Sequence, residues 1–391
     1  MTVHFVVDEK IIDQVIDNFL QVSSNHIFFV FTDNLGDNFY HITRSGSFIR
    51  RFYYLHEDIN ELLDTIDTHS IILHQLNFEF AKIINQINQS IKIAWIAWGF
   101  DIYSLPKILP SIYAPKTKQF IFKNKPATPL IWFIKKNDIA RNVFYSLMGQ
   151  NDPYREIFNA INRIDYFSTY IREDFDFFSK FYKNNKLHFI ESTFSTIDQY
   201  LAGNQNLRIK ENANSIIIGN SNTLESNYLD VIYKIREKRE KLNKIFCVLS
   251  YGKNKYHRKK VISEGRKNLR DKFQPLTVFI SREQYIEMLQ SCSTGIFFHY
   301  RQQAMGNIIA LLYMGARVYL SEKNPTFHFF LRNGIVVNSF ENEFNTYLNE
   351  KLSLEDTDNN RNKLDLIFQK EKVISDLKNL THSLEPSHVN S

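Results

Sequence analysis

Short apolar runs alternate with stretches of helical periodicity over most of the chain. In the first half, the strands that we predict span residues 3–7, 26–32, 48–55, 70–75 and 91–98. The helices between them are predicted at 9–20, 57–66 and 78–87. Apolar runs without polar alternation are typical of strands buried on both faces, and strands separated by helices indicate a parallel sheet. The chain therefore begins with a doubly wound α/β domain.

A second alternating unit follows residues 201–214, a polar stretch containing asparagine and glycine that we interpret as the interdomain linker. Its predicted strands span 215–218, 244–250, 276–281, 294–300, 317–320 and 335–338. Its predicted helices span 225–239, 282–292 and 307–314. A length of 391 residues is long for one domain and fits two. We predict domains at 1–205 and 206–380, with a polar tail at 381–391.

The alternation is interrupted between residues 103 and 129, which hold five of the nine prolines. Because proline breaks helices and strands, we expect this segment to be an irregular excursion near the surface. Beyond it, helices are predicted at 136–148, 152–163 and 172–182, with a strand near 165–170.

The composition is that of a folded protein, with 43% hydrophobic and 23% charged residues. The 34 Phe and 20 Tyr accompany abundant Asn, Ile and Lys, which indicates an AT-rich genome rather than a stacking platform for nucleic acid. Cys247 and Cys292 lie in apolar segments and are expected to be core residues in a reducing compartment. Since no apolar run reaches ~18 residues and no signal core is visible, we predict a cytoplasmic protein.

The net charge of +6 is concentrated in two basic clusters at 234–244 and 253–260, followed by further lysines and arginines up to Lys272. Such a surface can face an anionic membrane, nucleic acid or a phosphorylated ligand. A charge run on a helix can equally be its solvated face. No known nucleic-acid-binding motif is present, so nucleic acid is not an expected partner.

Polar loops follow four predicted strands of the second domain, and parallel strands bring such loops to one edge of the sheet. In the loop at 301–307, Arg301 can bind phosphate oxygens and Gly306 permits close backbone approach at a helix N-terminus. The Gly219-Asn220-Ser221 turn lacks a dinucleotide fingerprint and a P-loop, and a plain turn with a helix cap stays open as its alternative. The predicted donor-binding residues are Gly219, Asn220, Ser221, Tyr251, Gly252, Arg301, Gln302, Gln303, Gly306, Asn307 and Asn324.

In the first domain, polar side chains end two neighbouring strands. Asp101 is our first candidate for the base that deprotonates an acceptor hydroxyl, and His74 is the second. A lone His or Asp at a strand end can instead be a cap or turn residue. The remaining predicted acceptor-side residues are Gln75, Asn77, Trp98, Gly99 and Tyr103.

A metal site is not expected. The Asp174-Phe175-Asp176 pair has the spacing of a metal-binding DxD motif, but it lies in a predicted helix whose first turn suits acidic residues. The twelve histidines show no zinc-ligand spacing. We therefore expect a protein without a metal or other cofactor.

Taken together, these motifs resemble the bacterial TDP-N-acetylfucosamine:lipid II N-acetylfucosaminyltransferases, from about residue 70 to 327. The most specific part is residues 285–306, which end in Arg301-Gln302-Gln303-x-x-Gly306. The resemblance implies a GT-B glycosyltransferase with two facing Rossmann-like domains and parallel sheets. In that family a 4-acetamido-4,6-dideoxygalactose unit passes from a dTDP-sugar to an undecaprenyl-diphosphate-linked saccharide of enterobacterial common antigen or a related polysaccharide.

The resemblance also implies an enzyme that lies peripherally on the inner face of the bacterial cytoplasmic membrane, where the basic clusters would contact anionic lipid. The chain departs from the family pattern in the lysine-rich residues 253–272 and in the loop at 222–226. A UDP- or GDP-sugar and another acceptor are therefore an alternative. A non-catalytic binding protein and a sugar-nucleotide epimerase of the same fold are two others.

Overall fold

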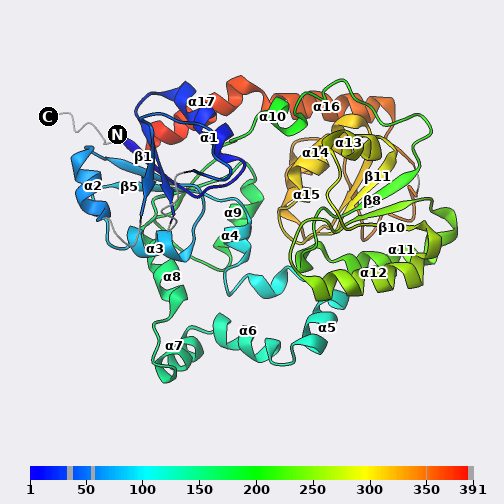
Figure 1. Ribbon diagram of the computed structural model, residues 1–391, viewed down its shortest axis with the longest axis horizontal. Helices are drawn as coiled ribbons and strands as arrows, with labels where there is room; N and C mark the ends of the chain where they lie inside the picture. Colours follow the sequence, from blue (N-terminus) through cyan, green and yellow to red (C-terminus); the bar gives the residue numbers. More distant parts are fainter. Residues whose placement is uncertain (33–37, 54–57, 349, 386–391) are drawn as a thin grey trace. The chain divides into compact units, whose positions relative to one another are not determined.

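The computed structural model (Figure 1) describes residues 1–32, 38–53, 58–348 and 350–385. The chain divides into two compact units. The first unit contains residues 1–105, 137–196 and the chain from Phe368 onward, and the second contains residues 106–136 and 197–367.

The first unit is built on a parallel sheet whose described strands have the order β3-β2-β1-β4-β5-β6-β7. These strands are β1 (Thr2–Val6), β2 (His26–Phe31), β3 (Ile49–Phe52), β4 (Ser70–Leu73), β5 (Lys92–Ile96), β6 (Tyr166–Ser168) and β7 (His188–Ile190). Its helices are α1 (Ile12–Val22), α2 (Ile59–Thr65), α3 (Phe78–Ile84), α4 (Phe100–Tyr103), α7 (Asp138–Leu147), α8 (Pro153–Arg163), α9 (Arg172–Ser179) and α17 (Lys370–Ser383).

Both faces of this sheet are covered. Every residue of β1 and β4 is buried, as their continuous apolar runs predict. Helix α1 packs against α17, and α3 packs against α8. Because the chain winds from β1 toward β3 and later from β4 toward β7, right-handed crossovers place α1 and α3 on opposite faces. The strand order reverses between β1 and β4, the usual position of a ligand crevice in an open α/β sheet.

The second unit contains another parallel sheet, with the order β10-β9-β8-β11-β12-β13 among its described strands. These are β8 (Ser215–Ile218), β9 (Ile245–Val248), β10 (Phe273–Leu276), β11 (Cys292–Phe297), β12 (Arg317–Leu320) and β13 (Asn338–Ser339). Its α-helices are α5 (Pro115–Asn124), α6 (Thr128–Lys136), α10 (Ile197–Leu201), α11 (Tyr228–Ile235), α12 (Lys255–Leu269), α13 (Arg282–Gln290), α14 (Met305–Met314), α15 (Pro325–Arg332) and α16 (Leu354–Phe368). Short 3₁₀ turns occupy Leu109–Ser111, Leu224–Ser226, Arg236–Lys241 and Arg270–Lys272.

The segment predicted as an irregular excursion is largely helical and belongs to the second unit. Buried Asn227 holds it there, because its side chain accepts from the backbone N–H of Ala114 and donates to the carbonyl of Ile112. The Asp230 carboxylate accepts from the backbone N–H groups of Lys116 and Thr117. The prolines do not break these helices, because Pro115 and Pro129 stand in first turns, where the missing N–H removes no helical bond.

Other predicted boundaries also differ from the structure. The predicted division at 205/206 treats each domain as one continuous segment, whereas each unit includes a segment from the other half of the chain. The prediction of a strand at 276–281 is wrong, because β10 ends at Leu276. Helix α17 continues to Ser383 in the predicted tail, and residues 386–391 lie outside the described part. No helix in the described ranges is long and apolar enough to span a membrane.

Candidate functional site

The order of the second sheet reverses between β8 and β11, and two predicted donor loops meet there. Residues 219–221 follow β8, and residues 298–304 follow β11. The side-chain amide of Gln303 donates to Asn220 Oδ1 at 2.8 Å and to Ser221 Oγ at 3.1 Å. Neighbouring parallel strands thus bring together residues some eighty positions apart, as the sequence predicts, at the edge where such sheets bind ligands.

Two glycines in these loops are required by geometry. Gly219 has a φ of +60°, and a Cβ there would lie 2.4 Å from the Tyr228 ring. Gly252 has a φ of +110°, and its Cβ would lie 2.7 Å from the carbonyl oxygen of Asn222. Both loops therefore need glycine for their conformation and for space, independently of any ligand.

Asn222 joins the loop after β8 to the loop after β9. Its backbone N–H donates to the Tyr251 carbonyl at 2.5 Å, and its side chain donates to the Asn254 carbonyl at 2.9 Å. Tyr251 is 64% exposed at this edge. The sequence pattern missed Asn222, because an asparagine in a polar loop carries no signal of burial.

Helix α14 starts two residues earlier than predicted. Its N-cap, Ala304, has a left-handed backbone with a φ of +66°, a strained conformation for a residue with a Cβ. Gly306, in the first turn, is exposed, and a Cβ there would meet no atom within 4 Å. Open space beside Gly306 fits a ligand at the helix N-terminus.

Arg301 lies half-buried before this helix, and its guanidinium donates to the carbonyl of Gln302 at 3.1 Å. The Gln302 side chain is buried. Arg301 therefore places a positive charge in the same loop as the positive end of the α14 dipole.

Several buried polar atoms near the loops after β11 and β12 have no hydrogen-bond partner among the described residues. They include Oε1 of Gln303, Nδ2 of Asn324 and both ring nitrogens of His299. Asn324 uses its Oδ1 to cap α15, accepting from the N–H of Thr326. Because buried polar groups are nearly always paired, these atoms mark places for ligand or water contacts.

His299 was not selected from the sequence, because it stands in an apolar run that resembles a buried strand. It is fully buried, and burial, followed by the positive charge of Arg301, lowers its pKa to about 3. His299 is therefore neutral at physiological pH and can both donate and accept hydrogen bonds.

In the first unit, Asp101 is buried and holds two strand-end loops together. Its Oδ2 accepts from Trp95 Nε1 at 2.7 Å and from the backbone N–H of Leu76 at 3.2 Å. Its Oδ1 accepts from the backbone N–H groups of Trp98 and Ile102, each at 3.1 Å. Burial raises its pKa to about 6, although these hydrogen bonds oppose the shift.

This geometry does not fit the role of catalytic base that we predicted for Asp101. Four N–H groups occupy both carboxylate oxygens, so neither oxygen is left to accept a proton from a substrate hydroxyl. A base must reach the proton that it removes. Asp101 instead positions the loops after β4 and β5.

His74 is the end of a chain of three buried imidazoles. Its Nε2 lies 2.8 Å from His4 Nδ1, and His4 Nε2 lies 2.9 Å from His26 Nδ1. Burial lowers the pKa of His74 to about 3 and of His26 to about 4, and it lowers that of His4 well below its usual range. Nδ1 of His74 has no partner in the described protein, so one nitrogen at the end of β4 is left for another group.

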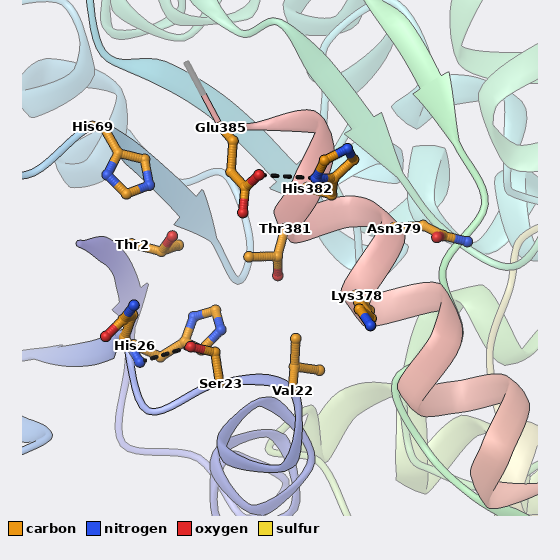
Figure 2. A pocket seen from close by; sticks show the side chains of 11 residues that line it. Thr2, Val22, Ser23, His26, His69, Lys378, Asn379, Thr381, His382 and Glu385 are labelled. Atoms are coloured by element: carbon orange, nitrogen blue, oxygen red, sulfur yellow. Dashed lines mark hydrogen bonds and ion pairs between the residues drawn. The ribbon is translucent and has the colours of Figure 1, made fainter. Parts of the chain in front are cut away.

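The other end of the imidazole chain borders a cavity of about 370 Å³ at the amino ends of the strands, shown in Figure 2. Thr2 and His26 begin β1 and β2, and His69 directly precedes β4. On the opposite side lie His382, in the last turn of α17, and Glu385, two residues beyond the helix, whose side chains are 2.8 Å apart. This cavity is at the sheet edge opposite His74, so it is separate from the predicted acceptor side.

The other acceptor-side residues have mixed roles. Asn77 caps α3 by accepting from the N–H of Phe80, and Tyr103 donates to buried Asp174 at 2.5 Å, so both stabilise the fold. Gly99 has a φ of +89° at the start of α4. The remaining two, Gln75 and Trp98, have features that are common at ligand sites. Gln75 has a strained φ of +134°, and Trp98 has an indole nitrogen without a described partner.

The DxD pair lies in helix α9, as predicted. Asp174 accepts from Tyr103, and Asp176 lies 3.4 Å from the guanidinium of Arg172. The described residues contain no group of three or more His, Cys, Asp or Glu side chains placed to hold a metal ion.

Comparison with known families and structures gives a consistent result. The family model described as 4-alpha-L-fucosyltransferase, glycosyl transferase group 56, matches residues 158–362, just over half of the chain. No curated protein matches the sequence. The chain is similar in fold to a glycosyltransferase from Rickettsia africae ESF-5, with 11% identity, coverage of 100% and 99% of the two chains, and a TM-score of 0.59.

Two further solved structures share the fold. Sucrose-phosphate synthase from Thermosynechococcus elongatus has 9% identity, coverage of 98% of each chain and a TM-score of 0.61. An E. coli structure titled trehalose-6-phosphate, bound with UDP-2-fluoro glucose, has 10% identity, coverage of 98% of each chain and a TM-score of 0.58. The matched family model covers most of the second unit, including every predicted donor-side residue. The chain therefore belongs to the 4-alpha-L-fucosyltransferase family, glycosyl transferase group 56, and it is a glycosyltransferase of the GT-B fold.

Proposed function

We propose that this glycosyltransferase moves a deoxy-acetamido sugar, similar to 4-acetamido-4,6-dideoxygalactose, from a dTDP-sugar to an undecaprenyl-diphosphate-linked saccharide. The product is a precursor of a bacterial surface polysaccharide such as enterobacterial common antigen. The observation that carries the proposal is the hydrogen bond from Gln303 to Asn220. This bond joins the loops after β8 and β11, where the strand order of the second sheet reverses, beside the N-terminus of α14.

On the donor side, the negative charge that develops on the leaving nucleoside diphosphate needs stabilisation in the transition state. The first-turn N–H groups of α14 and the Arg301 guanidinium supply positive charge for this purpose. The turn at Gly219, Asn220 and Ser221 offers a second set of donors. These groups take the part that a divalent metal plays in other transferases, so the reaction is proposed to be metal-independent.

On the acceptor side, His74 is proposed as the group that takes the proton from the attacking hydroxyl. Its imidazole is neutral, and Nδ1, which has no described partner, can accept the hydroxyl proton. Since burial lowers the pKa of His74 to about 3, the positive charge must leave the ring as that proton arrives. Nε2 of His74 therefore passes its own proton to Nδ1 of His4, and Nε2 of His4 passes one to Nδ1 of His26. Nε2 of His26 then releases a proton toward the cavity that His26 lines, so that no imidazole stays charged. Gln75 and Trp98 are proposed to contact the acceptor saccharide.

A lipid-linked acceptor implies a membrane surface as a partner, and we place the enzyme peripherally on the inner face of the cytoplasmic membrane. The basic cluster on α12 supports this placement, since Lys255 and Lys259 are exposed there. Attraction of exposed lysines to anionic lipid is screened by salt, with a Debye length of ~8 Å at ~0.15 M ionic strength.

Thermal-shift titration of the purified protein with dTDP, UDP, GDP and CMP, each with and without EDTA, tests the donor proposal. A nucleotide at 100 times its Kd adds about 2.7 kcal/mol of stability. We expect stabilisation by dTDP that EDTA does not change. Stabilisation by UDP or GDP would keep the donor-site assignment and replace dTDP in the proposed sugar nucleotide. No response to any nucleotide would overturn the donor site and favour a non-catalytic binding protein.

A further inference from the structure

A cavity of about 820 Å³ lies in the second unit, between helices α5 and α6 and the loops after β8 and β9. Aromatic side chains line much of its wall, among them Tyr113, Phe120, Trp132 and Tyr256. Pockets that bind small organic ligands have volumes of roughly 300–1,000 Å³ and walls that are mainly apolar and aromatic. The residues that line this cavity all belong to the second unit, so its shape is set within that unit.

The rings of this cavity are arranged for stacking. Tyr113 and Trp132 are parallel to within 2°, with their centroids 5.6 Å apart, and Phe122 meets the Trp132 ring edge-on at 5.5 Å. The Tyr113 hydroxyl donates to Glu225 Oε1 at 3.3 Å, which holds this ring in place. Tyr256, which also lines the cavity, is 81% exposed. Flat ligands such as nucleobases bind on side chains of this kind, because every base has a π-face.

Two asparagines give the cavity polar groups of both kinds. Asn124 donates from Nδ2 to the carbonyl of Phe120 at 2.7 Å, and Asn254 accepts at Oδ1 from the backbone N–H of His257 at 3.0 Å. Each amide keeps its other polar atom for a ligand, an acceptor oxygen in Asn124 and a donor nitrogen in Asn254. The edge of a pyrimidine such as thymine presents a ring N–H beside carbonyl oxygens. A base therefore uses both amides, whereas an aliphatic chain uses neither.

The cavity adjoins the proposed diphosphate site, which belongs to the same unit. Leu224 lines the cavity, and the preceding residue, Thr223, has its Oγ1 3.5 Å from Nε2 of Gln303. Burial raises the pKa of Tyr113, and the positive charge of Arg301 opposes this shift, so these two side chains lie within electrostatic range of each other. A ligand with its base in the cavity can thus direct phosphate groups toward Arg301.

The charge around the cavity favours an anionic ligand. Residues 106–136, which form α5 and α6, contain seven lysines and no acidic residue. Lys125 lines the cavity. Lys118 is partly buried, and burial and then the charge of Lys323 lower its pKa. Since lysines gather here without acidic residues on α5 or α6 to offset them, the surroundings attract negative charge. An aromatic wall beside a cationic surface fits a nucleotide.

We propose that this cavity binds the base of the sugar-nucleotide donor, a pyrimidine stacked against Trp132 and Tyr256 with its diphosphate directed toward Arg301. The inference rests on the proposed function, because it names the place of the nucleoside of that donor. It gives α5 and α6, which come from the first half of the chain, a role in selecting the nucleotide.

Photocrosslinking locates the base directly. The probe is 5-iodo-2′-deoxyuridine diphosphate, in which iodine replaces the methyl group of thymine. It is irradiated in complex with the intact protein, and mass spectrometry identifies the labelled residue. We expect the crosslink at Trp132 or Tyr256, and an excess of dTDP should abolish it. A crosslink confined to the loop after β10, where Phe279 is 73% exposed, would overturn the proposal.

Calorimetric titration of variants measures what the rings contribute. Trp132→Leu and Tyr256→Ala are each expected to lower the affinity for dTDP by about tenfold, as for the loss of one stacking contact, and to leave the affinity for inorganic pyrophosphate unchanged. Tyr256→Ala provides the answer even if Trp132→Leu misfolds, because the Tyr256 side chain is exposed. Tyr40→Ala, at an 88% exposed tyrosine of the first unit, is the matched control and should bind dTDP as the wild type does.

The outcomes separate this subsite from the proposed function. Wild-type affinity for dTDP in both variants would overturn the base site and leave the donor proposal intact. Equal affinities of the wild type for dTDP and pyrophosphate would do the same, because the base would then add nothing. Displacement of the crosslink by undecaprenyl phosphate in detergent, but not by dTDP, would assign the cavity to a lipid chain and overturn the proposal. No binding of any nucleotide would remove the donor site and this subsite together.

Discussion

The Asp101 carboxylate lies 2.7 Å from the indole nitrogen of Trp95, a buried residue near the carboxyl end of β5. The same carboxylate accepts backbone N–H groups from the loops after β4 and β5. One side chain thereby fixes the position of His74, Gln75 and Trp98 relative to the sheet. Its role is positional, and its removal is expected to affect stability first.

Asp101→Ala should destabilise the protein by at least about 2 kcal/mol, because each buried donor left without a partner costs about 1–3 kcal/mol. Urea unfolding of the variant and the wild type measures the difference. Asp176→Ala is the control, since Asp176 is more than half exposed and its ion pair with Arg172 is on the surface. Equal destabilisation by both variants would contradict the positional role.

Gln303→Glu should weaken nucleotide binding by about tenfold or more, since a carboxylate there would face Asn220 Oδ1 and repel the donor diphosphate. Isothermal titration with the nucleotide that stabilises the wild type provides the affinity. The same change at the exposed Gln274 controls for net charge. Unchanged affinity in the Gln303 variant would remove this residue from the donor site.

Two glycines offer a comparison between folding and binding. Gly219→Ala should be strongly destabilising, because its Cβ would overlap the buried Tyr228 ring at a positive φ. Gly306→Ala should leave stability unchanged or raise it by about 0.5–1 kcal/mol, since alanine favours helices. If a diphosphate approaches the backbone there, the Gly306 variant should nevertheless bind nucleotide less tightly. A Gly306 variant with wild-type affinity would argue against that approach.

Arg301→Ala should lower turnover on the order of 10²-fold, as expected for the loss of one strong transition-state donor. Arg301→Lys should recover part of the rate, because lysine keeps the charge and loses the bidentate geometry. Steady-state transfer assays with the identified donor measure kcat and KM separately. Arg266→Ala, a change at an exposed site on α12, is the control. An Arg301→Ala enzyme with wild-type turnover would refute the assignment.

The buried histidines make the protein sensitive to acid. The folded-state pKa is about 3 for His74 and about 4 for His26, both below the ordinary value of 6.5. The unfolded chain therefore binds more protons as the pH falls below 6.5, and the free energy of unfolding decreases from there toward about pH 4. Asp101 acts in the opposite sense, since its raised pKa of about 6 favours the folded state on acidification.

His74→Gln isolates the histidine contribution, because Asp101 is present in both proteins. Urea unfolding between about pH 7 and about pH 4.5 should show a shallower pH dependence in this variant than in the wild type. His188→Gln, at an exposed position of β7, should leave the pH dependence unchanged. Identical pH profiles for all three proteins would mean that His74 takes up its proton without unfolding.

The sequence predicted the elements that local patterns determine. The apolar runs of β1, β4 and β8 are continuous because both sheet faces are covered, and Gly315 ends α14 in the left-handed conformation that favours glycine. The loops at Asn220 and Gln303 were also predicted to converge, since the carboxyl ends of parallel strands share one edge. Their direct hydrogen bond needed the strand order, which places β8 beside β11.

The remaining features depend on contacts between distant segments. His4, His26 and His74 each resemble an isolated residue near an apolar run, and only the pairing of β1 with β2 and β4 joins them. Prolines at 115 and 129 obscured α5 and α6, because proline favours a helix start as well as a break. Helix α7 was predicted, but the exposure of its Ile139 and Leu147 side chains was not, because periodicity shows that an apolar face exists and not what covers it.

Helix α17 gives the first unit a particular order of assembly during synthesis. Its buried Val373, Leu377 and Leu380 belong to the helix that packs on α1, and Asp376 accepts from the backbone N–H of Thr193. The ribosome must therefore complete the whole second unit before α1 receives its cover. Until then, the nascent first unit exposes the apolar side of α1, and a chaperone that shields this surface would increase the yield of folded enzyme.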